Sequence, residues 1–186
     1  MKTLFTKTLI LFFTAIFLIG CKQEEKQENG LVVKESNEKV EYSRIYPFTG
    51  TNSKDIFTVN LKGSKPEDMV IDFSIQNEQK EVIYNVSIKG LDLLGSTDPN
   101  LDLRLKEDQI TFIKNIAKDF LNEEHFLEPA VMPDQEIDTY TPDPKFFEEL
   151  RKNGLNGFMY RLGKENKYYI AYSITEKKVK VYYNCC

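Results

Sequence analysis

The chain of 186 residues contains one histidine, no tryptophan and three cysteines. A Ser-His-Asp or Cys-His arrangement would have to use His125, yet no nucleophile-elbow motif accompanies it. His125 stands at the end of a predicted helix, where an imidazolium interacts favourably with the helix dipole. The sequence therefore predicts no nucleophilic catalysis, and no catalytic residue is assigned.

Phosphate-binding and metal-binding motifs are also missing from the sequence. The nine glycines are scattered as turn residues and form no phosphate loop. Asp98, Asn100 and Asp102 have the one-three-five spacing of a calcium loop. Leu103 replaces the glycine that such a loop requires, and Gln109 replaces its bidentate acid. We therefore expect a polar turn here, and we predict no metal and no cofactor.

Two of the three cysteines, Cys185 and Cys186, are adjacent at the end of the chain. Neighbouring Cα atoms lie about 3.8 Å apart, below the usual disulfide range of about 4.4–6.8 Å. A structural zinc site needs four ligands, and no second cluster supplies them. Free thiols, intermolecular pairing and a strained bridge all remain open for this pair.

The N-terminal segment has the layout of a secretory signal. Lys2 and Lys7 accompany an uncharged apolar run of eleven residues from Leu9 to Ile19. A membrane span needs about 20 apolar residues, so this run is too short to be one. We therefore expect residues 1–20 to be a targeting segment.

The targeting segment ends in Leu18-Ile19-Gly20-Cys21, which resembles the lipobox of bacterial lipoproteins. The resemblance implies that residues 1–20 are a lipoprotein signal peptide and that Cys21 becomes the lipid-bearing N-terminus. It also implies export and anchoring of the chain in the membrane of the cell envelope by that lipid. Lys22 in place of Asp departs from the inner-membrane retention signal of enteric lipoproteins, which favours the outer membrane, on its periplasmic or its surface face.

The charge of the mature chain bears on its partners. The leader contains two lysines and no acid, so its removal changes the formal net charge from −4 to −6. An acidic chain without a basic stripe is a poor candidate for binding nucleic acid, so we predict no nucleic-acid partner. Membrane contact should come from the lipid, and stable anchoring takes more than one acyl chain.

Composition divides the remaining chain into two parts. Residues 22–30 are charged, rich in amides and free of aromatics, which is typical of an unfolded linker. The sequence therefore predicts a flexible tether over residues 21–41 and a single globular domain over residues 42–186.

The hydrophobic pattern of that domain predicts strands and helices in separate runs. Period-two alternation predicts strands over residues 55–61, 69–75, 82–88, 158–162, 168–174 and 179–183. A three-to-four-residue period predicts one helix over residues 110–121, and Asp143, Pro144 and Gly154 predict the start and stop of a second. Three strands, two helices and three strands indicate an α+β fold: antiparallel sheet of about six strands with the helices on one face.

Tyrosine is concentrated near the C-terminus, where six of the ten lie between Tyr160 and Tyr183. Tyr160, Tyr168, Tyr172 and Tyr183 share the apolar phase of the strands and are assigned to the core. Tyr169, Tyr182 and Arg161 fall on the opposite phase. Tyrosine and arginine are enriched at interface hot spots, so this face is a candidate partner-binding surface. Cross-strand pairing of tyrosines on a wet face is the alternative interpretation.

A second candidate is an acidic loop around Tyr140, which could bind a cation or a basic partner surface or simply be solvated. Its carboxylates are Asp134, Glu136, Asp138 and Asp143.

Three functions are compatible with these features. The first is a non-enzymatic binding or interaction module that meets a protein, peptide or glycan, for example an inhibitor that caps a basic toxin. The second is an envelope hydrolase with paired carboxylates, which needs two acids in one cleft. Its candidates are Asp72, Asp92, Glu136 and Asp138. The third is a purely structural or assembly lipoprotein, which predicts a surface without a pocket or an exposed aromatic cluster.

Overall fold

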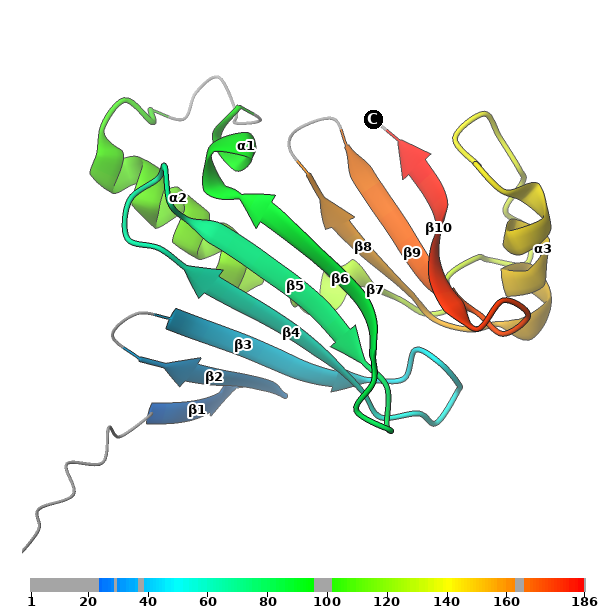
Figure 1. Ribbon diagram of the computed structural model, residues 1–186. Helices are drawn as coiled ribbons and strands as arrows, with labels where there is room; N and C mark the ends of the chain where they lie inside the picture. The colour runs from blue at the N-terminus through cyan, green and yellow to red at the C-terminus, as the bar shows by residue number, and fades with distance from the viewer. Residues whose placement is uncertain (1–23, 29, 37–38, 96–101, 163–165, 186) are drawn as a thin grey trace, which may run out of the picture.

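Two antiparallel sheets dominate the computed structural model, which describes residues 24–28, 30–36, 39–95, 102–162 and 166–185 (Figure 1). Consecutive strands pair throughout the first sheet. It contains β1 (Glu24–Glu28), β2 (Leu31–Glu35), β3 (Lys39–Tyr46), β4 (Asp55–Lys62), β5 (Val70–Gln76) and β6 (Val82–Lys89). The second sheet has the order β10 (Lys178–Cys185), β9 (Lys167–Ser173), β8 (Gly157–Arg161) and β7 (Phe126–Leu127).

The helices separate the two runs of strands in sequence. α1 (Gly90–Leu94) and α2 (Lys106–Asp119) follow β6, and a one-turn 3₁₀ helix (Glu123–His125) leads into β7. α3 (Pro144–Asn153) precedes β8. Among the described residues, none of these helices is long and apolar enough to cross a bilayer.

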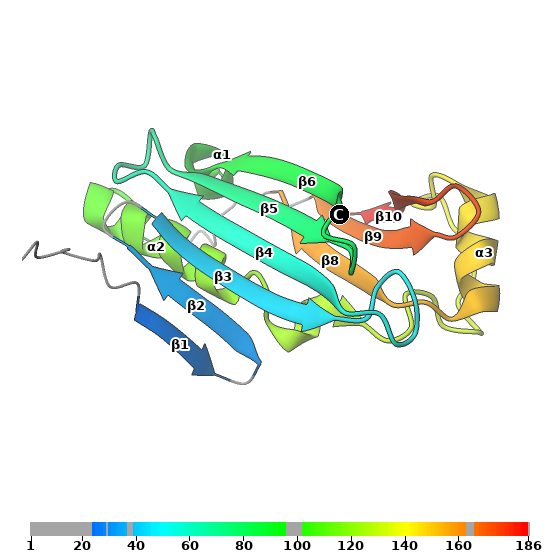
Figure 2. The same cartoon turned by 60° about the horizontal axis from the view of Figure 1, so that its bottom comes forward.

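The predicted α+β class with antiparallel sheet is confirmed, but the predicted sheet arrangement is wrong in two respects. The described strands form one sheet of six and one of four, whereas about six strands were predicted in total. The two longer helices also occupy different layers (Figure 2). α2 covers the inner face of the first sheet, whereas α3 covers the outer face of the second.

The segment 21–41, predicted to be a flexible tether, contains β1, β2 and the start of β3, so that prediction is wrong for these residues. β2 pairs with β3 in a continuous register from Leu31 opposite Arg44 to Glu35 opposite Val40. Leu31 and Val33 pack against the main core. The composition suggested disorder because few apolar residues are present, but a neighbouring strand satisfies the backbone groups and provides apolar surface.

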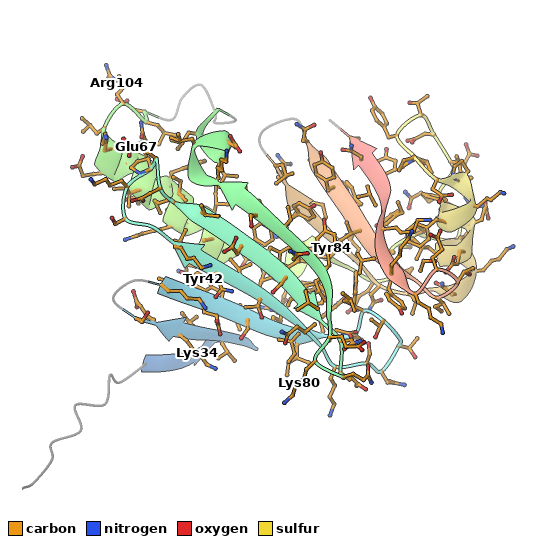
Figure 3. The ribbon with its side chains drawn as sticks, in the orientation of Figure 1. Lys34, Tyr42, Glu67, Lys80, Tyr84 and Arg104 are labelled. Carbon is orange, nitrogen blue, oxygen red and sulfur yellow. The ribbon has the colours of Figure 1, made fainter. Side chains whose placement is uncertain are left out.

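The main core lies between the two sheets and consists largely of phenylalanine. The Phe158 ring of β8 lies 5.2 Å from the ring of Phe57 and 5.1 Å from that of Phe73. Tyr84, labelled on β6 in Figure 3, completes the contact, because its hydroxyl oxygen lies 2.5 Å from that of Tyr160 on β8. The two sheets therefore share one core and cannot be separated without exposing it.

A second core lies on the opposite face of the four-stranded sheet. Phe146, Phe147 and Leu150 of α3 are buried there against Ala171 and Tyr182. The four-stranded sheet is thus covered at both faces, and only part of its outer face is left for a site.

Candidate functional site

A β-bulge in β10 determines the candidate site. The register with β9 pairs Val181 with Ile170 and then Tyr183 with Tyr169, so Tyr182 is an extra residue on this strand. Such a bulge interrupts the alternation of side chains between the two faces. The rings of Tyr182 and Tyr183 consequently both contact Tyr169, at centroid distances of 6.2 Å and 5.3 Å.

These three tyrosines contribute to a pocket of about 410 Å³, called here the tyrosine pocket. The segment between β7 and α3 supplies the remaining wall. The described residues that line it are Phe126, Leu127, Glu128, Pro129, Ala130, Met132, Gln135, Tyr169, Tyr182 and Tyr183.

Backbone contacts fix that wall on the sheet. The Ala130 N–H donates to the Leu155 carbonyl at 2.8 Å, and the Tyr182 hydroxyl donates to the Ala130 carbonyl at 2.7 Å. A Cβ atom at Gly157 would lie 2.9 Å from the Cβ of Ala130, closer than side chains pack. Glycine at this position therefore allows the wall to approach the sheet.

The acidic loop predicted from the sequence borders the same pocket. The Tyr183 hydroxyl donates to Asp138 Oδ2 at 2.8 Å, and the Tyr140 ring lies 6.0 Å from the Tyr183 ring. The Asn184 N–H donates to the Tyr140 carbonyl at 3.0 Å, which attaches the loop to β10. The bond to Asp138 stabilises the neutral phenol and raises the pKa of Tyr183 to about 12.

A second pocket of about 550 Å³ adjoins the first, and Phe126 and Glu128 line both. Arg44, Tyr46 and Glu123 complete its lining. The Tyr46 hydroxyl donates to Glu128 Oε1, and burial together with this bond raises the pKa of Tyr46. Arg44 lies over the Phe126 ring at 5.7 Å and its Nη1 is 3.5 Å from Glu123 Oε1.

The tyrosine pocket has acidic character. Among the described residues, Glu128 is the one charged residue in its lining. The basic groups behind it have their own counter-ions, since Arg151 pairs with Glu148 at 3.0 Å and Lys180 pairs with Asp143 at 2.7 Å. The charge among the described lining residues is therefore that of a carboxylate.

The structure brings together two of the three residues predicted to bind a partner. Tyr169 and Tyr182 line one pocket, but the Tyr182 side chain is only 1% exposed and its hydroxyl is used by Ala130. The prediction that Tyr182 lies on an exposed face is therefore wrong. Arg161 is exposed but lies two register rows from Tyr169, opposite Lys167, and is not among the described residues of the lining.

Sequence analysis missed Tyr183, which it assigned to the core. Strict alternation from Val179 places Tyr183 inside, and the bulge overturns that assignment. Glu128 and Met132 were also missed, because they lie in an irregular segment without a periodic signal.

The other residues considered from the sequence lie elsewhere. His125 Nδ1 is 2.8 Å from the Phe120 carbonyl, a local contact at the end of α2. Cys185 forms a disulfide, whereas Cys21 and Cys186 lie outside the described residues. Asp98 and Asn100 also lie outside them. Within the part of the chain that is described, no three metal-ligating side chains converge.

In comparisons with known proteins, no family model, no curated protein and no solved structure matches this chain.

Proposed function

We propose that this chain is a membrane-anchored envelope lipoprotein that acts as a non-enzymatic binding module and holds a protein or peptide partner in the tyrosine pocket. The observation that carries the proposal is the convergence of Tyr169 and Tyr183 with Met132 around one hollow. Met132 is 52% exposed and Tyr140, on the adjoining loop, is 47% exposed. Exposed aromatic and thioether groups beside a pocket are typical of interface anchors.

The alternative of a carboxylate hydrolase receives less support. A general acid needs a raised pKa. Asp72 has the opposite property, because bonds from Lys62 at 2.8 Å and from Ser87 at 2.5 Å lower the pKa of its carboxyl. A purely structural role is also less well supported, since it predicts a surface with neither pocket nor exposed aromatic groups.

The lipid anchor rests on the lipobox resemblance, and Cys21 lies outside the described residues. We expect the mature protein to begin at Cys21 and to carry diacylglycerol. The intact mass of protein purified from its own cells tests this. Cys21→Ser should leave an unacylated precursor that retains residues 1–20, and an intact mass of the unaltered protein without lipid would refute the anchor.

Cross-linking of the anchored protein in its own cells tests the binding role. We expect one partner at near-equal stoichiometry, and we expect Tyr169→Ala and Tyr183→Ala to reduce its recovery about tenfold each, the size of a moderate hot spot. Ile174→Ala is the matched control, because Ile174 is 52% exposed but lies outside the pocket lining. Capture that survives both tyrosine changes, in protein whose thermal unfolding is unaltered, would contradict the proposal.

A further inference from the structure

The rings of the tyrosine pocket meet at steep angles. Tyr169 and Tyr183 have an interplanar angle of 86°, and Tyr169 and Tyr182 one of 69°. Rings at right angles form the walls of a corner rather than a flat platform. A sugar ring stacks best on an open flat face, whereas a compact cation is attracted by the π-faces and carboxylates that surround a corner.

The charges near this corner favour a cation as well. Glu128 lies in the lining, and Asp138 is attached to the Tyr183 hydroxyl at 2.8 Å. Two basic groups of the neighbouring segments have acceptors of their own, because Arg151 is bonded to Glu148 and to the Gln135 carbonyl and Lys180 is paired with Asp143. A cation that entered would gain attraction from both carboxylates, whereas an anion would be repelled.

We infer that the tyrosine pocket binds an organic cation, namely the guanidinium or alkylammonium group of a basic side chain presented by the partner. This inference rests on the proposed binding function and specifies the chemistry of its partner. Tyr169 and Tyr183 supply π-faces, Glu128 supplies a counter-charge, and Met132 covers the aliphatic stem of the guest.

The arrangement also assigns a role to the bond between Tyr183 and Asp138. It holds the Tyr183 ring in place without using a face of the ring, because the hydroxyl lies in the ring plane. Tyr183→Phe should therefore retain binding within about twofold, whereas Tyr183→Ala should lose it, since the π-face provides the attraction.

A pair of peptides provides the test. Each is acetylated, amidated and flanked by glycine and serine, and one carries arginine where the other carries its uncharged isostere citrulline. Each peptide is titrated into the full mature chain in non-ionic detergent micelles, and the tyrosine fluorescence of the protein is followed. The chain contains no tryptophan whose emission would obscure that of tyrosine. We expect the arginine peptide to bind at least about tenfold more tightly than the citrulline peptide, and more weakly as salt is added.

Variants locate the binding. Tyr169→Ala, Tyr183→Ala and Glu128→Gln should each reduce the affinity for the arginine peptide several-fold, and Ile174→Ala should leave it unchanged. Equal affinity for the two peptides, or a preference for arginine that survives all three variants, would overturn the inference.

The two proposals fail in different ways. If cells yield a partner whose capture needs Tyr169 and Tyr183 but arginine shows no advantage over citrulline, the cation inference is wrong and the binding function stands. If capture is independent of both tyrosines, the proposed function is wrong irrespective of the peptide result.

Discussion

At the scale of single residues, the hydroxyl of Tyr183 connects the edge of a sheet to an acidic loop. The hydroxyl donates a hydrogen bond to Asp138 Oδ2 at 2.8 Å, and this bond raises the pKa of Tyr183 to about 12. In the unfolded chain this phenol should ionise near pH 10. Between those values the folded state retains a proton that the unfolded state has lost, so the free energy of unfolding should fall as the pH rises. Below pH 10 the contribution of this bond is complete.

We expect the ionisation midpoint of Tyr183 in Asp138→Ala to move down toward about 10, because the accepting carboxylate has been removed. Titration of protein labelled with carbon-13 in the tyrosine rings measures this midpoint by NMR, and Tyr183→Phe identifies the signal. An unchanged midpoint in Asp138→Ala would show that the bond does not determine the ionisation.

Asp55 organises the loop between β3 and β4. It is fully buried and accepts the N–H groups of Phe48 and Thr49, both at 2.8 Å, and the Thr49 hydroxyl at 2.9 Å. Asp55→Ala would leave the Thr49 N–H without its acceptor and the Phe48 N–H with only Ser53 Oγ at 3.1 Å, at a cost of about 3 kcal/mol in the free energy of unfolding. Chemical denaturation measures this cost.

Asp68→Ala is the matched control for that experiment. Asp68 also accepts two backbone N–H groups, from Ser64 at 2.9 Å and Lys65 at 2.8 Å, but it lies in an exposed loop where water can replace it. Its substitution should have a clearly smaller effect. Equal effects of the two changes would mean that burial of the Asp55 carboxylate is unimportant.

At the scale of elements, the termini of α3 were predictable because they depend on local chemistry. Asp143 Oδ1 accepts the Lys145 and Phe146 N–H groups at 3.1 Å each. Gly154 ends the helix with φ at +65°. Both signals are read directly from neighbouring residues.

Asp143 also pairs with Lys180, so two substitutions separate its roles. Asp143→Ala should lower the free energy of unfolding by about 1 kcal/mol through loss of the cap. Asp143→Asn keeps a good cap and removes only the charge, so most of the stability should remain. Thermal unfolding compares them, and equal losses would assign the effect to the ion pair rather than the cap.

Whether the strands could be predicted depended on whether their own residues show a periodic pattern. β4, β5 and β6 were predicted because apolar residues alternate along each of them, as in Phe57, Val59 and Leu61. β1 and β2 have little such alternation and are formed by pairing with β3. The bulge in β10 has no local signal either, so the sequence did not predict that Tyr182 would be buried or that Tyr183 would lie beside Tyr169.

At the scale of the whole molecule, the two sheets should unfold together because they share the core around Phe158. Its ring lies within 5.2 Å of the rings of Phe57, Phe73 and Phe126. Phe158→Ala should lower the free energy of unfolding by about 4 kcal/mol, and Phe158→Leu by less, because a smaller cavity remains. Denaturation followed by circular dichroism and by tyrosine fluorescence should give one coincident transition in the unaltered protein. Two separate transitions would mean that the sheets are independent.

The position of β1 has a consequence for how the protein would stand on a membrane. β1 begins three residues after Cys21, and three residues of extended chain span about 10 Å. A lipid on that cysteine would therefore hold this sheet edge too close to the membrane for the domain to rotate freely. β10, which carries Tyr182 and Tyr183, and α3 lie toward the opposite end of the molecule from β1, whereas β7 lies between them (Figure 1). A bilayer at that lipid would therefore lie next to β1 and restrict the orientations of the domain, with β10 and α3 on the side away from it.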